Sequence, residues 1–114
     1  FFLPRFIGLG KASALMMLGD KVSAADAERM GMIYKVVDDA TLEQEALAIA
    51  KTLSELPTKA IGLTKRLLNQ SMFNPLNKQL EYEGDMQVHA AQSEDYSEGV
   101  KAFLEKRKPV FNGN

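Results

Sequence analysis

Residues that begin helices recur at short intervals from Thr41 to the end of the chain, and they constrain its fold more than any other feature. They are Thr41, Thr58, Asn74 followed by Pro75, and Ser93. Serine, threonine and asparagine side chains accept hydrogen bonds from the free N–H groups of a first helical turn, and proline fits the first helical position. Gln44 gives Thr41 the spacing of a capping box. The sequence therefore predicts four consecutive helices, arranged like a helical bundle.

The residues before Thr41 differ, because glycines divide them into short elements. The almost wholly apolar stretch Lys11–Leu18 ends at Gly19 and predicts a helix with most of its surface buried. Ser23 is the expected cap of a helix over residues 24–30. The alternating, β-rich run Met32–Val37 predicts a strand. We therefore expect a mainly α fold with one or two short strands.

The charge balance argues against two classes of partner. The 114 residues include 14 lysines and arginines and 15 aspartates and glutamates, for a formal net charge of −1. A nearly neutral chain has no general electrostatic attraction to nucleic acid or to a membrane surface. Its apolar runs are too short to cross a bilayer. The absence of cysteine excludes disulfides and fits a cytoplasmic protein. We therefore expect no nucleic-acid partner and no membrane partner.

The last predicted helix, Ser93 to Pro109, combines an aromatic face with a basic tip. The face is formed by residues at helical spacing: Tyr96, Val100, Phe103, Leu104 and Arg107. The predicted last turn contains three cations: Lys106, Arg107 and Lys108. One interpretation is a surface helix whose charges complement the helix dipole. The other is a site for a flat, anionic ligand such as a nucleotide phosphate.

No group of residues forms a convincing catalytic or metal-binding pattern. His89 is the only histidine, and a metal site needs several ligands. Glu81, Glu83 and Asp85 crowd one segment, but residues two apart on a helix point to different faces. That spacing favours a solvated acidic surface over a paired acid–base site. We therefore assign no catalytic residue and no metal ligand.

Four segments, taken in order, resemble one family over the whole chain. They are Leu3–Gly8, Met17–Ala27, Gly31–Val37 and Ser93–Phe111. On these segments the chain is similar to the second half of the crotonase superfamily, the enoyl-CoA hydratases and isomerases, and the last segment matches that family's C-terminal signature. Within the family, residues 31–42 and 79–83 most resemble the phenylacetate-pathway branch, which isomerises ring-epoxidised phenylacetyl-CoA.

The resemblance implies a division of the chain. Residues 1–40 would be the tail end of the crotonase catalytic core, and residues 41–114 a helical oligomerisation region that packs subunits into homotrimers or hexamers. The family holds the thioester oxygen of an acyl-CoA in an oxyanion hole and moves protons with carboxylates. Both features are expected upstream of the position that matches Phe1.

The resemblance also implies a ligand and two residues that contact it. The substrate would be a coenzyme A thioester, with no covalently bound cofactor. Phe103 and Lys106 match positions where the C-terminal helix meets the adenine and phosphate end of CoA.

Two hypotheses follow. In the first, the chain is the C-terminal fragment of an acyl-CoA hydratase or isomerase, inactive alone, that supplies subunit contacts and part of the CoA site. In the second, it is a free-standing helical association module without a ligand.

Overall fold

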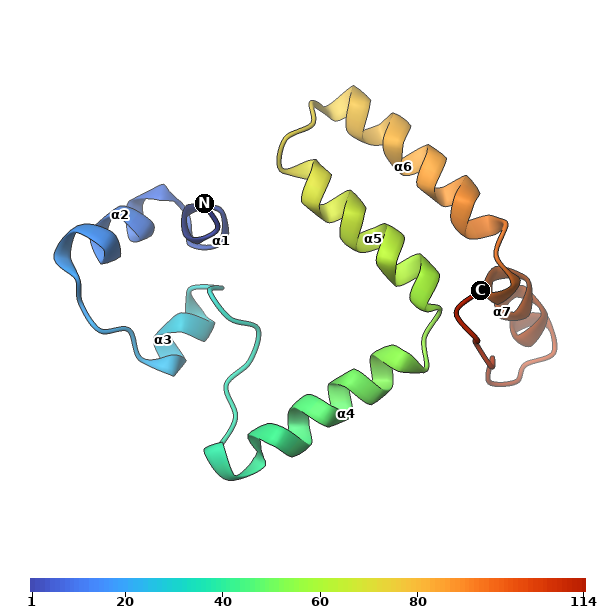
Figure 1. Cartoon of the computed structure of the whole chain (residues 1–114), viewed down its shortest axis with the longest axis horizontal. Helices are drawn as coiled ribbons and strands as arrows, with labels where there is room; N and C mark the ends of the chain where they lie inside the picture. The colour runs from blue at the N-terminus through green and yellow to red at the C-terminus, as the bar shows by residue number, and fades with distance from the viewer. The chain divides into compact units, whose positions relative to one another are not determined.

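All the regular elements of the protein are helices, as the computed structural model of residues 1–114 shows (Figure 1). They are α1 (Leu3–Ile7), α2 (Leu9–Leu18), α3 (Ala24–Arg29), α4 (Leu42–Ser54), α5 (Thr58–Ser71), α6 (Leu76–Ala91) and α7 (Glu94–Leu104), with a 3-10 helix, Asp39–Thr41, before α4. The chain divides into two compact units, residues 1–45 and 46–114. The mainly α prediction is therefore confirmed. No helix is both long enough and apolar enough to span a bilayer.

The strand predicted over residues 32–37 does not form. Gly31 follows α3 with a φ of 78°, and the N–H of Met32 bonds to the carbonyl of Ala27 at 2.8 Å. Farther on, the N–H of Val36 donates to the carboxylate of Glu28 at 3.0 Å. A strand requires a neighbouring strand to pair with its backbone groups, and here these groups turn to α3 instead. The strand predicted from the β-rich composition of this segment is therefore wrong.

The apolar helix α2 forms as predicted, but it is not buried. Gly19 ends it in the left-handed conformation, with φ 72°, and donates its N–H to the carbonyl of Leu15 at 3.0 Å. The side chains of Met16 and Met17 are nevertheless 73% and 84% exposed. Within its own unit α2 has only Ala12 buried, because the neighbouring short helices are too small to cover it. The expectation of a mostly buried helix is wrong for this chain.

Two of the predicted helix caps are confirmed. The hydroxyl oxygen of Ser23 accepts a hydrogen bond from the N–H of Asp26, and that of Ser93 accepts one from Tyr96, both at 3.1 Å. Each bond satisfies an N–H group that the first helical turn cannot satisfy within the helix.

The other predicted caps lie beside helices that do form, but they do not cap them. Thr41 belongs to the 3-10 helix, and its hydroxyl donates back to the carbonyl of Asp38 at 3.1 Å. The first residue of α5 is Thr58 itself, and α6 begins after Pro75; neither helix has a side-chain cap. The helix starts were thus predicted within one or two residues, while their capping bonds were wrong.

Helices α5 and α6 form an antiparallel hairpin (Figure 1). A buried glutamine, Gln79, holds its turn together. The side-chain amide of Gln79 donates to the carboxylate of Glu83 at 2.9 Å and to the carbonyl of Leu67 at 3.4 Å, and its oxygen accepts from Asn74 at 3.0 Å. Full satisfaction of this buried amide fixes the loop against both helices.

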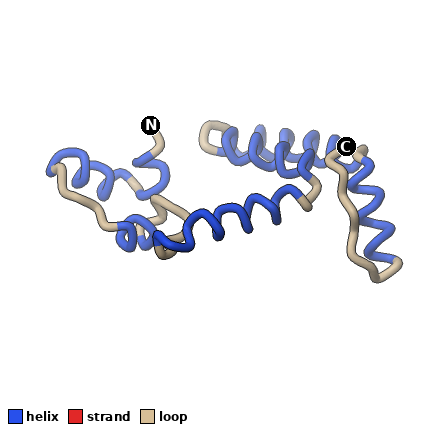
Figure 2. Tube along the Cα trace, turned by 60° about the horizontal axis from the view of Figure 1, so that its bottom comes forward, coloured by secondary structure: helices blue, strands red, loops and turns tan.

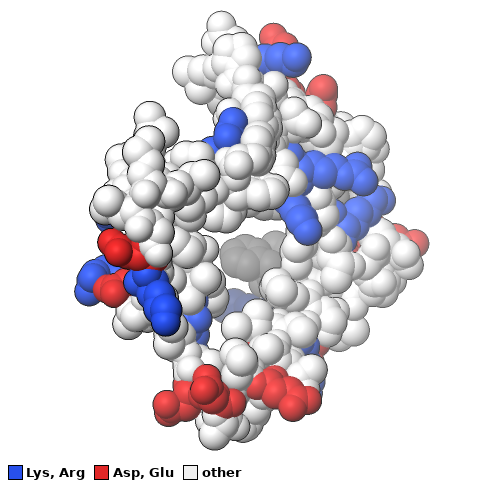
Figure 3. Space-filling model, turned by 60° about the vertical axis from the view of Figure 1, so that its left-hand side comes forward, with Lys and Arg blue, Asp and Glu red and all other residues white.

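The hydrophobic core within the chain is small. The only buried hydrophobic residues are Ile7, Ala12, Ala27 and Ala102. The apolar stripe of α4 stays open, with Ile49 and Leu53 41% and 46% exposed. Charged side chains occupy only part of the surface drawn in Figure 3, and much of that surface is uncharged. The bundle-like packing predicted for the last four helices is therefore incomplete, and apolar faces remain uncovered.

Candidate functional site

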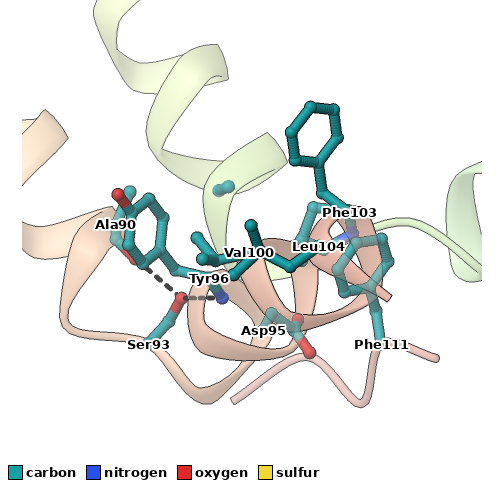
Figure 4. A pocket seen from close by; sticks show the side chains of 11 residues that line it. Ala90, Ser93, Asp95, Tyr96, Val100, Phe103, Leu104 and Phe111 are labelled. Carbon is teal, nitrogen blue, oxygen red and sulfur yellow. Dashed lines mark hydrogen bonds between the residues drawn. The ribbon is translucent and has the colours of Figure 1, made fainter. Parts of the chain in front are cut away.

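The candidate site lies on α7, where aromatic and aliphatic side chains border an open apolar cavity of about 400 Å³. The walls come from the start of α5, the end of α6, α7 and the C-terminal tail. Figure 4 shows Tyr96, Val100 and Leu104 on the same side of α7. These side chains are largely exposed, and Phe103 beside them is 82% exposed. The apolar part of the predicted aromatic face, Tyr96 to Leu104, is therefore present and available for contact.

Ser93 fixes the start of α7 against the end of α6. Its hydroxyl accepts from the N–H of Tyr96 and donates to the carbonyl of Ala90 at 2.7 Å, as the dashed lines in Figure 4 mark. Ser93 is buried, so both bonds are shielded from water. The Ser93 side chain therefore joins the last turn of α6 to the first turn of α7, the helix that carries the aromatic face.

The basic tip differs from its prediction, because α7 ends at Leu104 and not at Pro109. Lys106 follows the helix end with a positive φ of 53°. Arg107 therefore does not continue the aromatic face. Instead the chain reverses after Lys106, and the tail runs back alongside α7 (Figure 2). The sequence missed this reversal because a lysine is not a usual residue for a left-handed turn.

Arg107 closes the reversal by pairing with Glu98. Its two terminal nitrogens lie 2.6 and 2.8 Å from the two carboxylate oxygens of Glu98, and its Nε lies 2.6 Å from Glu105. The N–H of Val110 donates to Glu98 at 2.9 Å. Arg107, followed by this N–H group, lowers the pKa of Glu98 from 4.5 to about 2. The pKa of Arg107 is raised, mainly by its bonds to Glu98 and then to Glu105.

A second carboxylate of α7, Asp95, holds the far end of the tail. Its side chain is 2% exposed and accepts from the N–H of Asn112 at 2.7 Å and of Gly113 at 2.9 Å. The N–H of Asp95 donates to the carbonyl of Asn114 at 3.3 Å. Between the two carboxylates, the ring of Phe111 packs over Gly99. The tail is thus a strap, residues 109–114, fastened along α7 at both ends.

The three cations of the predicted tip have different environments. Arg107 pairs with Glu98 and Glu105, and Lys108 lies 3.7 Å from Glu55. Lys106 is exposed and forms no ion pair. Of the two residues expected to contact CoA, Phe103 lines the cavity and Lys106 follows it at the open end of α7. Lys106 is therefore the cation of the tip that is available to an anionic ligand.

The other residues considered in the sequence do not gather into a site. His89 is exposed, and no three histidine, cysteine, aspartate or glutamate side chains form a potential metal cluster. Glu83 accepts the hydrogen bond from Gln79, whereas Glu81 and Asp85 line a different, polar hollow. Sequence reasoning missed Asp95 and Glu98 as anchors of the strap. Glu98 and Arg107 are nine residues apart, and no local periodicity links such a pair.

The matching family model decides the relationship of the chain to known proteins. The model described as "Enoyl-CoA hydratase/isomerase" matches residues 1–114. The chain belongs to the enoyl-CoA hydratase/isomerase family. The expected crotonase resemblance is thereby confirmed.

Two curated members of the family illustrate the similarity. The 1,2-epoxyphenylacetyl-CoA isomerase of Escherichia coli K12 is 45% identical over 113 residues, which cover 99% of this chain and 43% of that protein. The crotonyl-CoA hydratase of Syntrophomonas wolfei is 34% identical over 109 residues, which cover 96% of this chain and 42% of that protein. The chain thus spans less than half the length of these members of the enoyl-CoA hydratase/isomerase family.

Solved structures of the family are similar in fold to this chain. A crystal structure of an enoyl-CoA hydratase/isomerase from Cupriavidus metallidurans CH34 superposes with a TM-score of 0.92 at 32% identity, covering 99% of this chain and 43% of that one. A crystal structure of an enoyl-CoA hydratase from Bacillus anthracis also superposes with a TM-score of 0.92 at 32% identity, covering 98% of this chain and 43% of that one. The fold of these 114 residues is therefore a helical portion of the crotonase fold.

Proposed function

We propose that this chain is the C-terminal part of an enzyme that acts on acyl-CoA thioesters, and that it supplies subunit contacts and part of the CoA site. Family membership over residues 1–114 is the observation that carries the proposal. In this proposal residues 1–40 end the catalytic core and residues 41–114 form the oligomerisation region. The substrate is a coenzyme A thioester, and the chain holds no covalently bound cofactor.

The CoA contact is assigned to Phe103 and Lys106. The exposed ring of Phe103 offers a flat apolar surface on which an adenine base can stack. The ammonium of Lys106, three residues later, has no carboxylate partner in the chain and can pair with a phosphate oxygen. An aromatic ring and an unpaired cation close together in the sequence can contact the base and a phosphate of one nucleotide.

The subunit contact is assigned to a second copy of the same chain. Val100 and Leu104 lie beside the cavity and are 45% and 74% exposed, in a region whose apolar neighbours are also uncovered. Contiguous apolar surfaces of this kind mark protein interfaces. A homotrimer or hexamer covers these faces with equivalent helices of other subunits.

The reaction is assigned only as far as the relatives support it. The similarity to an epoxyphenylacetyl-CoA isomerase, at 45% identity, favours isomerisation of the ring epoxide over hydration of an enoyl-CoA. A direct test is the turnover of both thioesters by the full-length protein. Faster conversion of the epoxide supports the isomerase branch, and faster hydration of crotonyl-CoA contradicts it.

The contribution of this part of the chain is tested by two further measurements. The isolated 114 residues are expected to leave crotonyl-CoA unchanged, and measurable turnover by them contradicts the proposal. In the full-length protein, Leu104→Glu places a charge in the proposed subunit contact and lowers the oligomer mass in sedimentation experiments. The control Gln87→Glu introduces the same charge on the polar surface of α6 and leaves the mass unchanged. Equal oligomer masses for the unchanged protein and both variants would contradict the proposed role of Leu104 in subunit contacts.

A further inference from the structure

The turn after α7 places a lysine where helices usually end on glycine. The N–H of Lys106 bonds to the carbonyl of Phe103 at 3.2 Å, and the N–H of Arg107 bonds to that of Ala102 at 3.0 Å. These two bonds define a Schellman motif, whose left-handed position favours glycine. Lys106 occupies that position with a φ of 53° and is the only residue other than glycine with a positive φ. The Cβ of an L-residue makes this conformation unfavourable.

Helix α3 ends in the same motif and supplies an internal comparison. The N–H of Gly31 bonds to the carbonyl of Glu28 at 2.9 Å, and the N–H of Met32 bonds to that of Ala27 at 2.8 Å. The left-handed residue here is Gly31, with a φ of 78°. The chain therefore uses glycine for this turn at one helix and a strained lysine at the other. Strain at a single residue points to a role for its side chain.

The side chain of Lys106 does not itself stabilise the turn. It is exposed and forms no ion pair, whereas the next two residues, Arg107 and Lys108, both face carboxylates. The groups that hold the turn in its strained conformation must therefore be found elsewhere.

Glu98 supplies that restraint from within α7. Its carboxylate receives both terminal nitrogens of Arg107, directly after Lys106, and the N–H of Val110, four residues after Lys106. A bidentate guanidinium–carboxylate pair fixes direction as well as distance. The backbone on the far side of Lys106 is thus tied to a rigid helix, and the strap beyond it is tied again at Asp95.

We propose that Glu98 is a positioning residue for ligand binding: by gripping Arg107 and the N–H of Val110, it holds Lys106 in the left-handed turn that presents its ammonium to the anionic end of acyl-CoA. The inference rests on the proposed function, because it assumes that Lys106 meets the CoA phosphates. It adds that the carboxylate of Glu98 increases the affinity for CoA, although its charge alone would repel this anionic ligand.

This contrast in sign makes Glu98→Gln a decisive variant. If Glu98 acts only through its charge, its removal strengthens CoA binding. If it positions Lys106, the affinity of the full-length protein for CoA falls about tenfold, as expected when the competent turn is populated about one-tenth of the time. Glu98→Asp keeps the charge but shortens the side chain, and it also weakens binding. Isothermal titration with CoA measures all three proteins, with Glu43→Gln on α4 as the control for a lost negative charge.

A double-mutant cycle with Lys106→Ala separates positioning from general destabilisation. Glu98→Gln is expected to have little further effect on CoA affinity once the lysine is absent. An equal loss of CoA affinity in both backgrounds overturns the positioning role, and so does unchanged or tighter binding by Glu98→Gln and Glu98→Asp. In either case the proposed function is retained if Lys106→Ala alone weakens CoA binding. If Lys106→Ala does not weaken CoA binding, both the CoA contact of Lys106 and the positioning role of Glu98 are contradicted.

Discussion

The guanidinium of Arg107 contacts both carboxylate oxygens of Glu98, at 2.6 and 2.8 Å, although nine residues separate the two in the sequence. The pair ties the chain that follows the left-handed turn at Lys106 back to α7, and the strap lies along the same helix. The turn that reverses the chain contains Lys106, the residue directly before Arg107, with a φ of 53°.

The first prediction concerns the pH at which the strap is released. The pKa of Glu98 is lowered to about 2 by Arg107 and by the N–H of Val110. A carboxyl group with a lowered pKa stabilises the fold fully above its unfolded value, and that contribution is lost as the pH falls through the folded value. The strap contact is therefore expected to be intact above pH 4.5 and to weaken between pH 4.5 and about 2. The carboxyl carbon of Glu98, followed by NMR, should titrate in that interval; a midpoint near 4.5 contradicts the pairing.

The second prediction concerns an ion pair of the first unit, which joins Lys35 to Glu45 at 2.9 Å. The hydrogen bond and charge of Glu45 raise the pKa of Lys35 above 10.5. The contribution of this ion pair to stability is therefore present below pH 10.5, and it is lost as the pH rises through the pKa that Lys35 has in the folded protein. Both side chains are nearly half exposed, so Lys35→Met should change the denaturation midpoint only slightly, and less at high salt. A large loss of stability that does not depend on salt would contradict this prediction, because it would show that the ion pair is shielded from solvent.

The third prediction compares two glycines given the same added methyl group. At Gly99 a Cβ would lie 3.6 Å from the ring of Phe111, an ordinary contact, so Gly99→Ala should stabilise the helix by up to about 1 kcal/mol. At Gly113 a Cβ would lie 2.6 Å from the hydroxyl of Thr58, and φ is 85°. Gly113→Ala should therefore destabilise the strap by about 1 kcal/mol or more. Denaturant unfolding, with exchange of the strap amides, measures both; shifts of the same sign contradict the described strap.

The fourth prediction concerns helix capping. Ser93→Ala removes a buried side chain that makes two hydrogen bonds, so it should lower the free energy of unfolding by about 1–2 kcal/mol. Thr58→Ala is the matched control, since α5 has no side-chain cap, and its effect should stay within about 0.5 kcal/mol. Similar losses for both variants would mean that Thr58 caps α5 after all.

The sequence predicted the helices well because their signals are local. Ser23 and Ser93 accept the capping bonds expected of them, and Gly19 ends α2 in the left-handed conformation. These signals depend on a few neighbouring residues and hold whatever the helix packs against. The crotonase resemblance, carried by segments along the whole chain, correctly identified the family.

The predictions that failed depend on contacts between segments that are distant in the sequence. The segment 32–37 has strand composition, but its backbone groups have no strand partner among these residues. Met16 and Met17 are apolar enough for a core, yet no other part of their unit covers them. The strap depends on Glu98 and Asp95 meeting residues at non-helical separations, which no periodic pattern encodes.

The central claim is that the tip of α7 binds the nucleotide end of CoA, and the affinity of Lys106→Ala in the full-length protein tests it most directly. The account predicts that this variant binds CoA more weakly by about 1.5–3 kcal/mol, or roughly ten- to 150-fold, because a charged contact is lost. Binding of an acyl-pantetheine thioester, which lacks the nucleotide, should be unchanged, and Lys78→Ala on α6 should bind both ligands normally. Unchanged affinity for CoA, or an equal loss for both ligands, would contradict the account.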